Sequence, residues 1–345
     1  MSTEGRRADD PLWPRASAWL ASGGAGSGPR LHVVGVPLSR TSLSPSGAHT
    51  TPPAVRAALR RFATFHAGLD VDLESLSATD HGDLDVADAT VADHLGRVED
   101  GLRRTGLVPL SLSRGDSDPG RPTQIRGGVG PDTTHAGQPA RPAGLVVLVG
   151  GDNAVTRPAM RTLLPLATSG LLTLDAHHDV RRFHDGPTNG TPVRGLVEDG
   201  LRGDHVVQVG ISHLGNSRAY RDWCEDRGVH LVGVDEARGR VGAVVTQQLD
   251  RLGQTCTDLY VDLDVDVVDV SFAPGCPGAR PGGLAPYELL EAAVEAGRHP
   301  LVRAVDITEV DATADPRGQT VDLAAMCLLS AAAGFASRAR DAARS

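Results

Sequence analysis

The chain has 345 residues, a formal net charge of −9 and an aromatic content of 3%. It contains no lysine, because all 34 basic residues are arginines, which excludes a Schiff-base lysine, a lysine base and the phosphate-binding lysine of a glycine-rich loop. The acidic balance and the scattered arginines also argue against nucleic acid as a partner. The expected class is one large α/β domain with a core of Val, Leu, Ala and Ile.

The two ends of the chain and its cysteines give no sign of secretion or of a membrane span. Residues 1–30 are rich in Gly, Ser, Arg and Pro, so we expect a mobile tail before a single domain over 31–340. The apolar stretch 323–336 is too short to span a bilayer and predicts a buried C-terminal helix. Four widely spaced cysteines without a C-x-x-C pair predict reduced thiols and a cytoplasmic protein.

The first part of the chain has few clear elements. A strand is expected at 31–37 and a helix from about Pro53. Residues 80–84 are turn-rich and follow a short extended segment, and a polar helix is expected at 91–103. The stretch 113–141 is rich in Gly, Pro, Asp, Arg and Thr without periodicity, which predicts a flexible insertion.

From residue 145 onward, apolar strands alternate with amphipathic helices. The predicted strands are 145–149, 171–175, 205–211, 229–234, 259–263 and 302–308. This alternation is typical of a parallel sheet with helices on both faces. We therefore expect a three-layer α/β/α fold with a doubly wound sheet of about eight strands.

Two stretches place potential metal ligands at alternate positions of an extended chain. They hold Asp175, His177 and Asp179 in the first, and Asp262, Asp264 and Asp266 in the second. Alternate side chains of a strand share a face, so each trio can converge on one site. Carboxylates gathered at the end of a buried sheet repel one another unless cations lie between them. The pattern therefore predicts a metal site.

Four polar clusters follow predicted strands, so they should meet at the edge where open α/β sheets bind ligands. They lie at residues 150–153, 175–179, 264–266 and 308–309. Taken alone, the first is better explained as a tight turn capped by Asn153, and it lacks the spacing of a dinucleotide-binding loop. Only its position beside the other three clusters makes residues 150–153 a candidate part of the ligand site.

Some polar residues have ordinary structural explanations. A lone His177 would more often be a buried histidine with satisfied hydrogen bonds, but its flanking aspartates favour a metal ligand. His178 should point to the other side of the strand and His184 lies in a Gly/Pro loop, so both are expected to be structural. Asp262 is expected to be a plain hydrogen-bonding residue.

Charge balance predicts two divalent cations. Asp175, Asp179, Asp264 and Asp266 carry four negative charges, which two such ions cancel. Mostly oxygen ligands with a single imidazole favour Mn²⁺, and a pair of ions that activates water indicates metal-assisted hydrolysis. Glu309 would then pair with a planar amidinium or guanidinium group, unless it forms only a surface salt bridge or begins a helix.

These motifs resemble the ureohydrolase family of arginases, agmatinases and formimidoylglutamases. The resemblance covers most of the chain from about residue 31. It rests on residues 150–152, 175–179, 264–269 with Pro274 and 281–283, and 306–310. The resemblance implies an arginase-like fold with a binuclear manganese site.

By position, the resemblance also implies the role of each ligand. Asp175 and Asp264 would bridge the two ions. His177 and Asp266 would bind one ion, and Asp179 would bind the other. Asp179 would also accept a proton and pass it on.

Two departures favour the formimidoylglutamase branch. The family's usual first motif ends in a metal-binding histidine, and here that position is Asn153, whose amide oxygen is a neutral and weaker ligand. Arginases have a proton-shuttling histidine after the second motif, and here that position is Asn189, which cannot shuttle a proton. Glu309 would hold the amidine group of the substrate.

In that branch the resemblance implies hydrolysis of N-formimidoyl-L-glutamate to L-glutamate and formamide. The two carboxylates of this small molecule require arginines, for which Arg181 is the first candidate and Arg218 the second. A homo-oligomer is expected. Two alternatives stay open: a hydrolase of agmatine or another guanidino compound, and a metal-poor, non-catalytic homologue that acts as a subunit or binding partner.

Overall fold

The computed structural model describes residues 10, 12–24, 26–107, 144–184 and 186–344. Over these residues the centre of the fold is a sheet of eight strands, whose neighbours all pair in parallel. In spatial order the strands are β4 (Ser77–Asp83), β1 (Arg30–Val36), β5 (Leu145–Gly150), β10 (Val302–Thr308), β9 (Asp258–Asp264), β6 (Ser169–Leu174), β7 (Val206–Ile211) and β8 (His230–Gly233). A short hairpin of β2 (Phe65–His66) and β3 (Val71–Asp72) lies apart from it.

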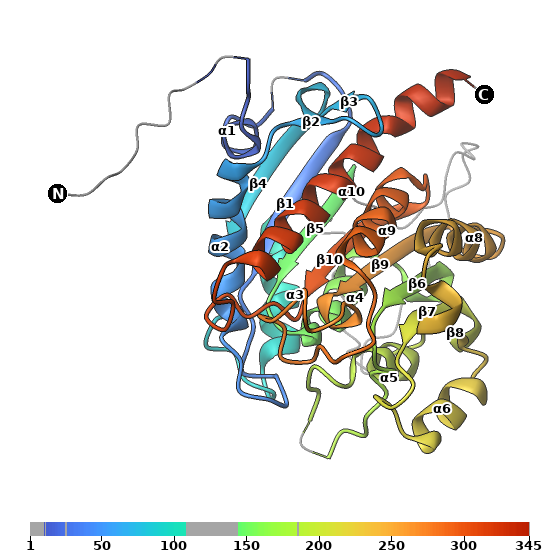
Figure 1. The fold of residues 1–345 in the computed structure, drawn as a ribbon. Coiled ribbons are helices and arrows are strands. Elements are labelled where there is room, and N and C mark those ends of the chain that lie inside the picture. Colours follow the sequence, from blue (N-terminus) through green and yellow to red (C-terminus); the bar gives the residue numbers. More distant parts are fainter. Residues whose placement is uncertain (1–9, 11, 25, 108–143, 185, 345) are drawn as a thin grey trace, which may run out of the picture.

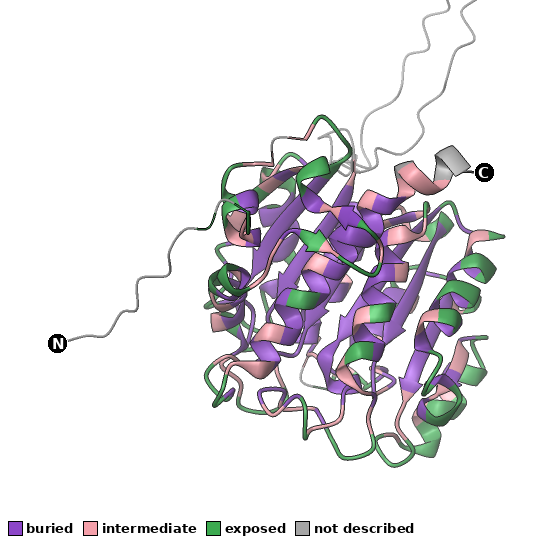
Figure 2. Ribbon diagram, turned by 45° about the horizontal axis from the view of Figure 1, so that its top comes forward, coloured by how far each residue is buried: buried purple, intermediate pink, exposed green. Residues whose placement is uncertain are grey.

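The central strands are apolar along their whole length because helices cover both faces of the sheet. In β1, Leu31 and Val33 belong to one core cluster, whereas Val34 and Val36 belong to the other. Figure 2 shows the strands as almost continuously buried. A parallel sheet buried on two sides needs such runs of Val and Leu. The predicted three-layer α/β/α fold is confirmed.

Two groups of helices form the outer layers (Figure 1). The first core cluster contains residues of α1 (Ala16–Ala21), α2 (Thr51–Ala58), α7 (Val234–Ala237), α8 (Val241–Gly253), α9 (Pro286–Arg298) and α10 (Gln319–Arg344). The second contains residues of α3 (His94–Arg104), α4 (Thr156–Leu163), α5 (Pro192–Glu198) and α6 (Arg218–Glu225). Each layer buries one face of the same sheet.

The expectation of a turn-rich stretch at residues 80–84 is wrong. Most of it belongs to β4, the edge strand that pairs with β1 from Ser77 to Asp83. An edge strand is covered less than a central one, so it keeps polar residues that hide it in a hydrophobicity pattern. Arg56 of α2 holds Asp80 through two hydrogen bonds of 2.7 and 2.8 Å, which fixes helix and strand together.

Part of the predicted N-terminal tail is a packed helix. In α1, Trp19 and Leu20 are each only 4% exposed, and Arg15 forms a β-bridge with Ala63 just before the helix. The expectation of a mobile tail is therefore wrong for this part, because its few apolar residues close the first core cluster. Residues 1–9 and the predicted insertion at 113–141 lie outside the described residues.

The C-terminal helix α10 runs from Gln319 to Arg344 and is longer than the predicted apolar stretch. Its segment Gln319–Arg338 is long and apolar enough to cross a membrane by length and composition. However, 78% of the apolar window is buried inside the fold, where α10 packs against α9 and α2. The prediction of a buried helix is confirmed.

The packing of α1 can be tested with two leucines of the same segment. We expect Leu20→Ala to lower the free energy of unfolding by about 2–4 kcal/mol, because it leaves a cavity in the core. Leu12→Ala should change it by less than about 0.5 kcal/mol, because Leu12 is 94% exposed. Urea unfolding of both variants measures the difference, and equal small effects would mean that α1 does not pack.

Candidate metal centre and substrate cavity

The polar clusters meet at the carboxyl ends of four adjacent central strands, β5, β10, β9 and β6. Asn153 follows β5, Glu309 follows β10, Asp264 ends β9, and Asp175 follows β6. All four side chains are buried, with at most 4% of each residue exposed. The predicted convergence of the clusters at one sheet edge is confirmed.

The first ligand stretch is a turn rather than a continued strand. Strand β6 ends at Leu174, and the Asp175 Oδ1 accepts a hydrogen bond of 2.6 Å from the backbone N–H of His177. Such a turn folds the chain back, so convergence does not depend on strand alternation. Asp179 lies at its end in the left-handed region, with φ of 52°.

The second ligand stretch repeats this arrangement. Strand β9 ends at Asp264, and the helical turn Val265–Val267 follows. Asp264 Oδ1 accepts a hydrogen bond of 2.8 Å from the backbone N–H of Asp266. The expectation that alternate strand positions bring the acids together is therefore wrong for Asp266, although the side chains do meet.

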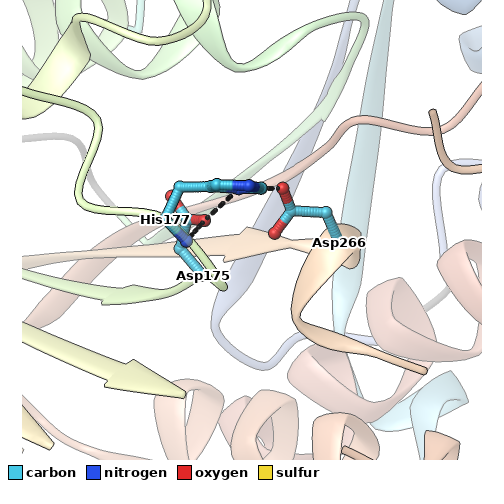
Figure 3. A group of neighbouring side chains, drawn as sticks. All are labelled: Asp175, His177 and Asp266. Atoms are coloured by element: carbon cyan, nitrogen blue, oxygen red, sulfur yellow. Dashed lines mark hydrogen bonds and ion pairs between the residues drawn. The ribbon is translucent and has the colours of Figure 1, made fainter. Parts of the chain in front are cut away.

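Two groups of side chains have the spacing of metal sites. Asp175, His177 and Asp266 form one group (Figure 3), and Asp175, Asp179 and Asp264 form the other, with ligand atoms within 4.8 Å in each. Asp175 belongs to both, so its carboxylate lies between the two positions. Its Oδ2 atom is buried without a hydrogen-bond partner among the described residues.

The carboxylates in these groups are strongly perturbed. Burial, together with repulsion from neighbouring acids, holds the pKa of Asp175 and of Asp264 well above the usual range. Burial likewise raises the pKa of Asp179 to about 7. Burial lowers the pKa of His177, but Asp175 and Asp266 outweigh it and raise the value to about 12. The site attracts positive charge, and divalent cations can supply it.

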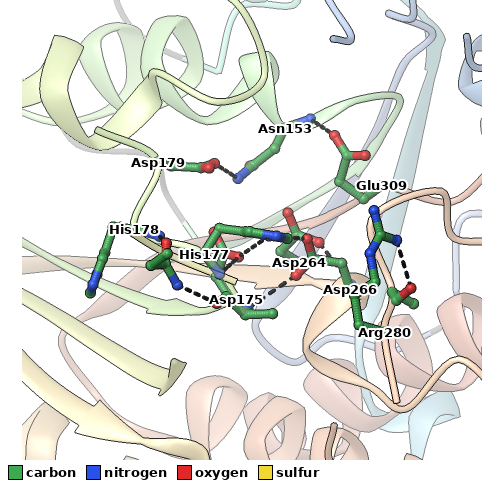
Figure 4. Close-up of polar contacts among 12 residues, drawn as sticks. Asn153, Asp175, His177, His178, Asp179, Asp264, Asp266, Arg280 and Glu309 are labelled. Carbon is green, nitrogen blue, oxygen red and sulfur yellow. Dashed lines mark hydrogen bonds and ion pairs between the residues drawn. The ribbon is translucent and has the colours of Figure 1, made fainter. Parts of the chain in front are cut away.

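The side chain of Asn153 turns its amide nitrogen, and not its oxygen, toward Asp179. Its Nδ2 donates to Asp179 Oδ2 at 2.8 Å, as Figure 4 shows. Its Oδ1 lies away from the acids and accepts from the hydroxyls of Thr156 at 2.7 Å and Thr308 at 3.3 Å. In this orientation the predicted ligand atom, the amide oxygen, does not face the acids.

Glu309 is fixed from two sides. Its Oε1 accepts from the backbone N–H of Asn153 at 2.8 Å and from Asn189 Nδ2 at 3.0 Å. Its own backbone has a φ of 63°, which is unfavourable for a glutamate. Burial raises the pKa of Glu309 to about 8. Asn189, at the position of the histidine that shuttles protons in arginases, therefore contacts the carboxylate of Glu309.

One cavity of about 150 Å³ adjoins these residues. It is lined by His177, Asp179, Asp264, Asp266, Asn189 and Glu309, and also by Arg181. Arg218 does not line it and lies instead at a neighbouring pocket with His213 and Arg221. Arg181 thus has the position expected for a substrate-binding residue, and Arg218 does not.

The cavity also has a wall that sequence reasoning missed. Arg280 and Tyr220 line it, and Nη1 of Arg280 donates to the carbonyls of Pro277 at 2.9 Å and Ala279 at 2.8 Å. Figure 4 shows this side chain turned toward the Glu309 side of the site. In the sequence, Arg280 is only a residue of the loop after the second acid motif. A loop has no regular pattern from which the direction of a side chain can be predicted.

The residues expected to be structural lie outside the two ligand groups. His178 is buried and its Nδ1 contacts Gln208 Oε1 at 2.7 Å. Asp262 is buried beneath the site, where its Oδ1 lies 3.5 Å from the hydroxyl of Thr308. His184 lies exposed in the loop after β6. These positions agree with the expectations.

The chain matches known proteins over most of its length. It is 33% identical to the formimidoylglutamase of Halalkalibacterium halodurans over 301 residues, which is 86% of this chain and 84% of the relative. It is also 33% identical to the Bacillus subtilis formimidoylglutamase over 307 residues, 88% of this chain and 86% of the relative.

Solved structures and a family model agree with these relatives. The crystal structure of the Bacillus subtilis formimidoylglutamase superposes with a TM-score of 0.77 at 28% identity, covering 97% of this chain and 96% of the other. A Trypanosoma cruzi formiminoglutamase with Mn²⁺ shares the fold, with a TM-score of 0.73 at 21% identity over 94% and 99% of the chains. The model of the arginase family matches residues 29–334. A chain with this match, this fold and these acid clusters belongs to the arginase family of metal-dependent hydrolases.

Proposed function

We propose that this protein hydrolyses N-formimidoyl-L-glutamate to L-glutamate and formamide, with two Mn²⁺ ions per subunit. One observation carries the proposal: a single cavity is lined by members of both metal-ligand groups, by the buried Glu309, and by Arg181 and Arg280. A formimino head suits the acids, and a dicarboxylate tail suits the arginines. A guanidino substrate with a cationic amine tail suits these arginines less well.

The residues present fit two cations. Asp175 offers a buried oxygen without a hydrogen-bond partner in the described structure, and its carboxylate belongs to both ligand groups. His177 and Asp266 would complete one site, and Asp179 and Asp264 the other. Carboxylate oxygens with one imidazole favour Mn²⁺ over Zn²⁺ or Mg²⁺. When bound, such ions supply Lewis acidity and activate water at neutral pH.

Glu309 orients the reacting group. Its carboxylate accepts two hydrogen bonds on Oε1, so it is held in place to pair with the N–H groups of a planar amidinium. Asn189 contributes one of these bonds and acts as a positioning residue. The formimino carbon is thereby directed toward the acid groups.

Asp179 moves the proton. Its carboxylate lines the cavity, where it can accept a proton from water and donate it again. It takes a proton from water as the oxygen bonds to the formimino carbon, and returns it to the glutamate nitrogen as the C–N bond breaks. The second proton of water leaves the oxygen as the carbonyl of formamide forms and protonates the released amine, so the oxygen ends in formamide and both hydrogens end on the glutamate nitrogen.

The location and assembly of the protein stay predictions. All four cysteines are free and buried, as suits a reducing compartment such as the cytoplasm. A homo-oligomer is expected from the family resemblance, and sedimentation of the purified protein tests it.

We expect purified protein to release glutamate and formamide from N-formimidoyl-L-glutamate only when Mn²⁺ is present. Both products are followed by mass spectrometry, with protein stripped by chelator as the control. Protein that binds Mn²⁺ yet forms no product would contradict the proposed substrate, and agmatine and other guanidino compounds would then be assayed. Protein that binds no Mn²⁺ would support a non-catalytic homologue.

The arginines should act on substrate binding more than on the chemical step. Arg181→Ala and Arg280→Ala should each raise KM about tenfold with little change in kcat, because one charge-assisted contact to a carboxylate is lost. An analogue without the α-carboxylate shows which arginine binds that group. The variant that lacks this arginine should bind the analogue as well as the wild type does, whereas the other variant should still bind it more weakly.

Arg202→Ala is the matched control for these variants. Arg202 precedes β7 at the opposite edge of the sheet and pairs with Asp204, so its loss should leave both constants unchanged. An unchanged KM in Arg181→Ala and Arg280→Ala would remove the arginines from the substrate site.

The metal-free protein should lose stability as the pH rises from 6 to 8. The raised pKa values of Asp175, Asp179 and Asp264 mean that the folded protein holds protons that the unfolded chain has released, so the free energy of unfolding falls with pH. His177 acts in the same direction. Its contribution to the free energy of unfolding is complete below its ordinary pKa of 6.5 and is lost as the pH rises toward its raised pKa of about 12.

Thermal unfolding at pH 6, 7 and 8, with and without Mn²⁺, measures this dependence. The cations replace the protons, so the stabilisation by Mn²⁺ should be largest at pH 8. Asp264→Asn should reduce both the slope and the effect of Mn²⁺. A melting temperature of the metal-free protein that rises over this range would contradict the account.

A further inference from the structure

The amide of Asn153 lies between two sets of partners that make opposite demands on it. Toward the acid groups, its Nδ2 donates to Asp179 Oδ2 at 2.8 Å. Toward the sheet, its Oδ1 lies 2.7 Å from the hydroxyl of Thr156 and 3.3 Å from that of Thr308. The two ends of a primary amide have nearly the same shape, so its partners decide which end points where.

The hydroxyl groups beneath Asn153 have too few hydrogens for the oxygen–oxygen contacts that they make. Thr156 Oγ1 lies 2.8 Å from Asp306 Oδ2 as well as 2.7 Å from Asn153 Oδ1. A hydroxyl has one hydrogen, so it can donate to only one of these two oxygens. The buried hydroxyl of Tyr260 also donates to Asp306 Oδ2, at 2.8 Å, which identifies that oxygen as an acceptor. One close oxygen–oxygen contact of Thr156 is left without a hydrogen.

Thr308 has the same problem. Its hydroxyl lies 3.3 Å from Asn153 Oδ1 and 3.5 Å from Asp262 Oδ1, and its single hydrogen can serve only one of them. The hydroxyls of Thr156, Thr308 and Tyr260 thus supply three hydrogens to five oxygen–oxygen contacts, so one contact of each threonine has no hydrogen. All of these groups are buried, where two oxygens in close contact without a hydrogen between them repel each other.

Turning the amide by half a turn removes the shortage. The Asn153 nitrogen then donates one hydrogen to Thr156 and one to Thr308, and each hydroxyl donates its own hydrogen to the acid below it. However, the amide oxygen would then face Asp179 Oδ2 at the 2.8 Å now spanned by a hydrogen bond. Two oxygens at that distance need a cation between or beside them.

We propose that Asn153 is a two-position element whose state is set by cation occupancy. Without a cation its nitrogen satisfies Asp179 through the 2.8 Å hydrogen bond. With a cation its oxygen becomes the ligand, and Thr156, Thr308 and Asp306 hold it in that orientation as positioning residues. This inference rests on the proposed two-ion site but not on the identity of the substrate.

Thr156→Val tests the proposal, because valine keeps the shape of threonine and cannot accept a hydrogen bond from the turned amide. Mn²⁺ binding to chelator-stripped protein is measured by isothermal titration calorimetry and by the electron paramagnetic resonance signal of free Mn²⁺. We expect one of the two ions to bind about tenfold or more weakly, with the other unchanged, as is typical when a partner of a metal ligand is removed. Thr156→Ser should restore the affinity to within about twofold.

Thr162→Val is the matched control, because Thr162 is a buried threonine of the same helix that donates to the carbonyl of Pro158 at 2.8 Å. It should bind both ions as the wild type does. Wild-type affinity for both ions in Thr156→Val would overturn the proposal, as would an equal loss in Thr162→Val or a wild-type protein that binds only one ion. None of these measurements contains substrate, so a wrong substrate assignment leaves them unaffected.

Discussion

The burial of several carboxylates at one sheet edge is the constraint on which the site depends. Asp175, Asp264 and Asp266 are nearly inaccessible to water, and their mutual repulsion adds to the cost of removing them from it. Parallel strands produce this crowding, because neighbouring strands end at the same edge. His177 offsets part of the charge, with its Nδ1 atom 2.6 Å from Asp266 Oδ2. Divalent cations would offset it more completely.

The backbone adopts turns and left-handed conformations where it brings the acids together at the sheet edge. Aspartate side chains bond to backbone N–H groups two residues ahead in both ligand stretches, and each bond turns the chain back over the sheet edge. Asp179 and Glu309 both adopt left-handed backbone conformations, at a typical cost of about 1–3 kcal/mol each. Neighbouring hydrogen bonds hold both residues there, so the fold sustains strain where it presents the two carboxylates to the cavity.

A second polar layer lies beneath the first. Asp306 is adjacent to Asp262 in the register of β10 and β9; Tyr260 donates to Asp306, and the hydroxyl of Thr156 lies 2.8 Å from the same carboxylate oxygen. Burial raises the pKa of Asp306 to about 6 and that of Asp262 well above its usual range. Such a layer costs free energy unless its hydrogen bonds are complete, which links the core of the sheet to the orientation of Asn153 above it.

The sequence by itself determined the central sheet and the identity of most acids, because long apolar runs and clustered aspartates act locally and leave a pattern. It did not reveal the edge strand β4 or helix α1, whose few apolar residues are buried only by contacts from distant parts of the chain. Tertiary structure alone decided that Arg280 lines the cavity and Arg218 does not, since side-chain direction in a loop follows no period. It also decided which end of Asn153 faces the acids, because that depends on hydrogens supplied by Thr156 and Thr308 from two separate elements.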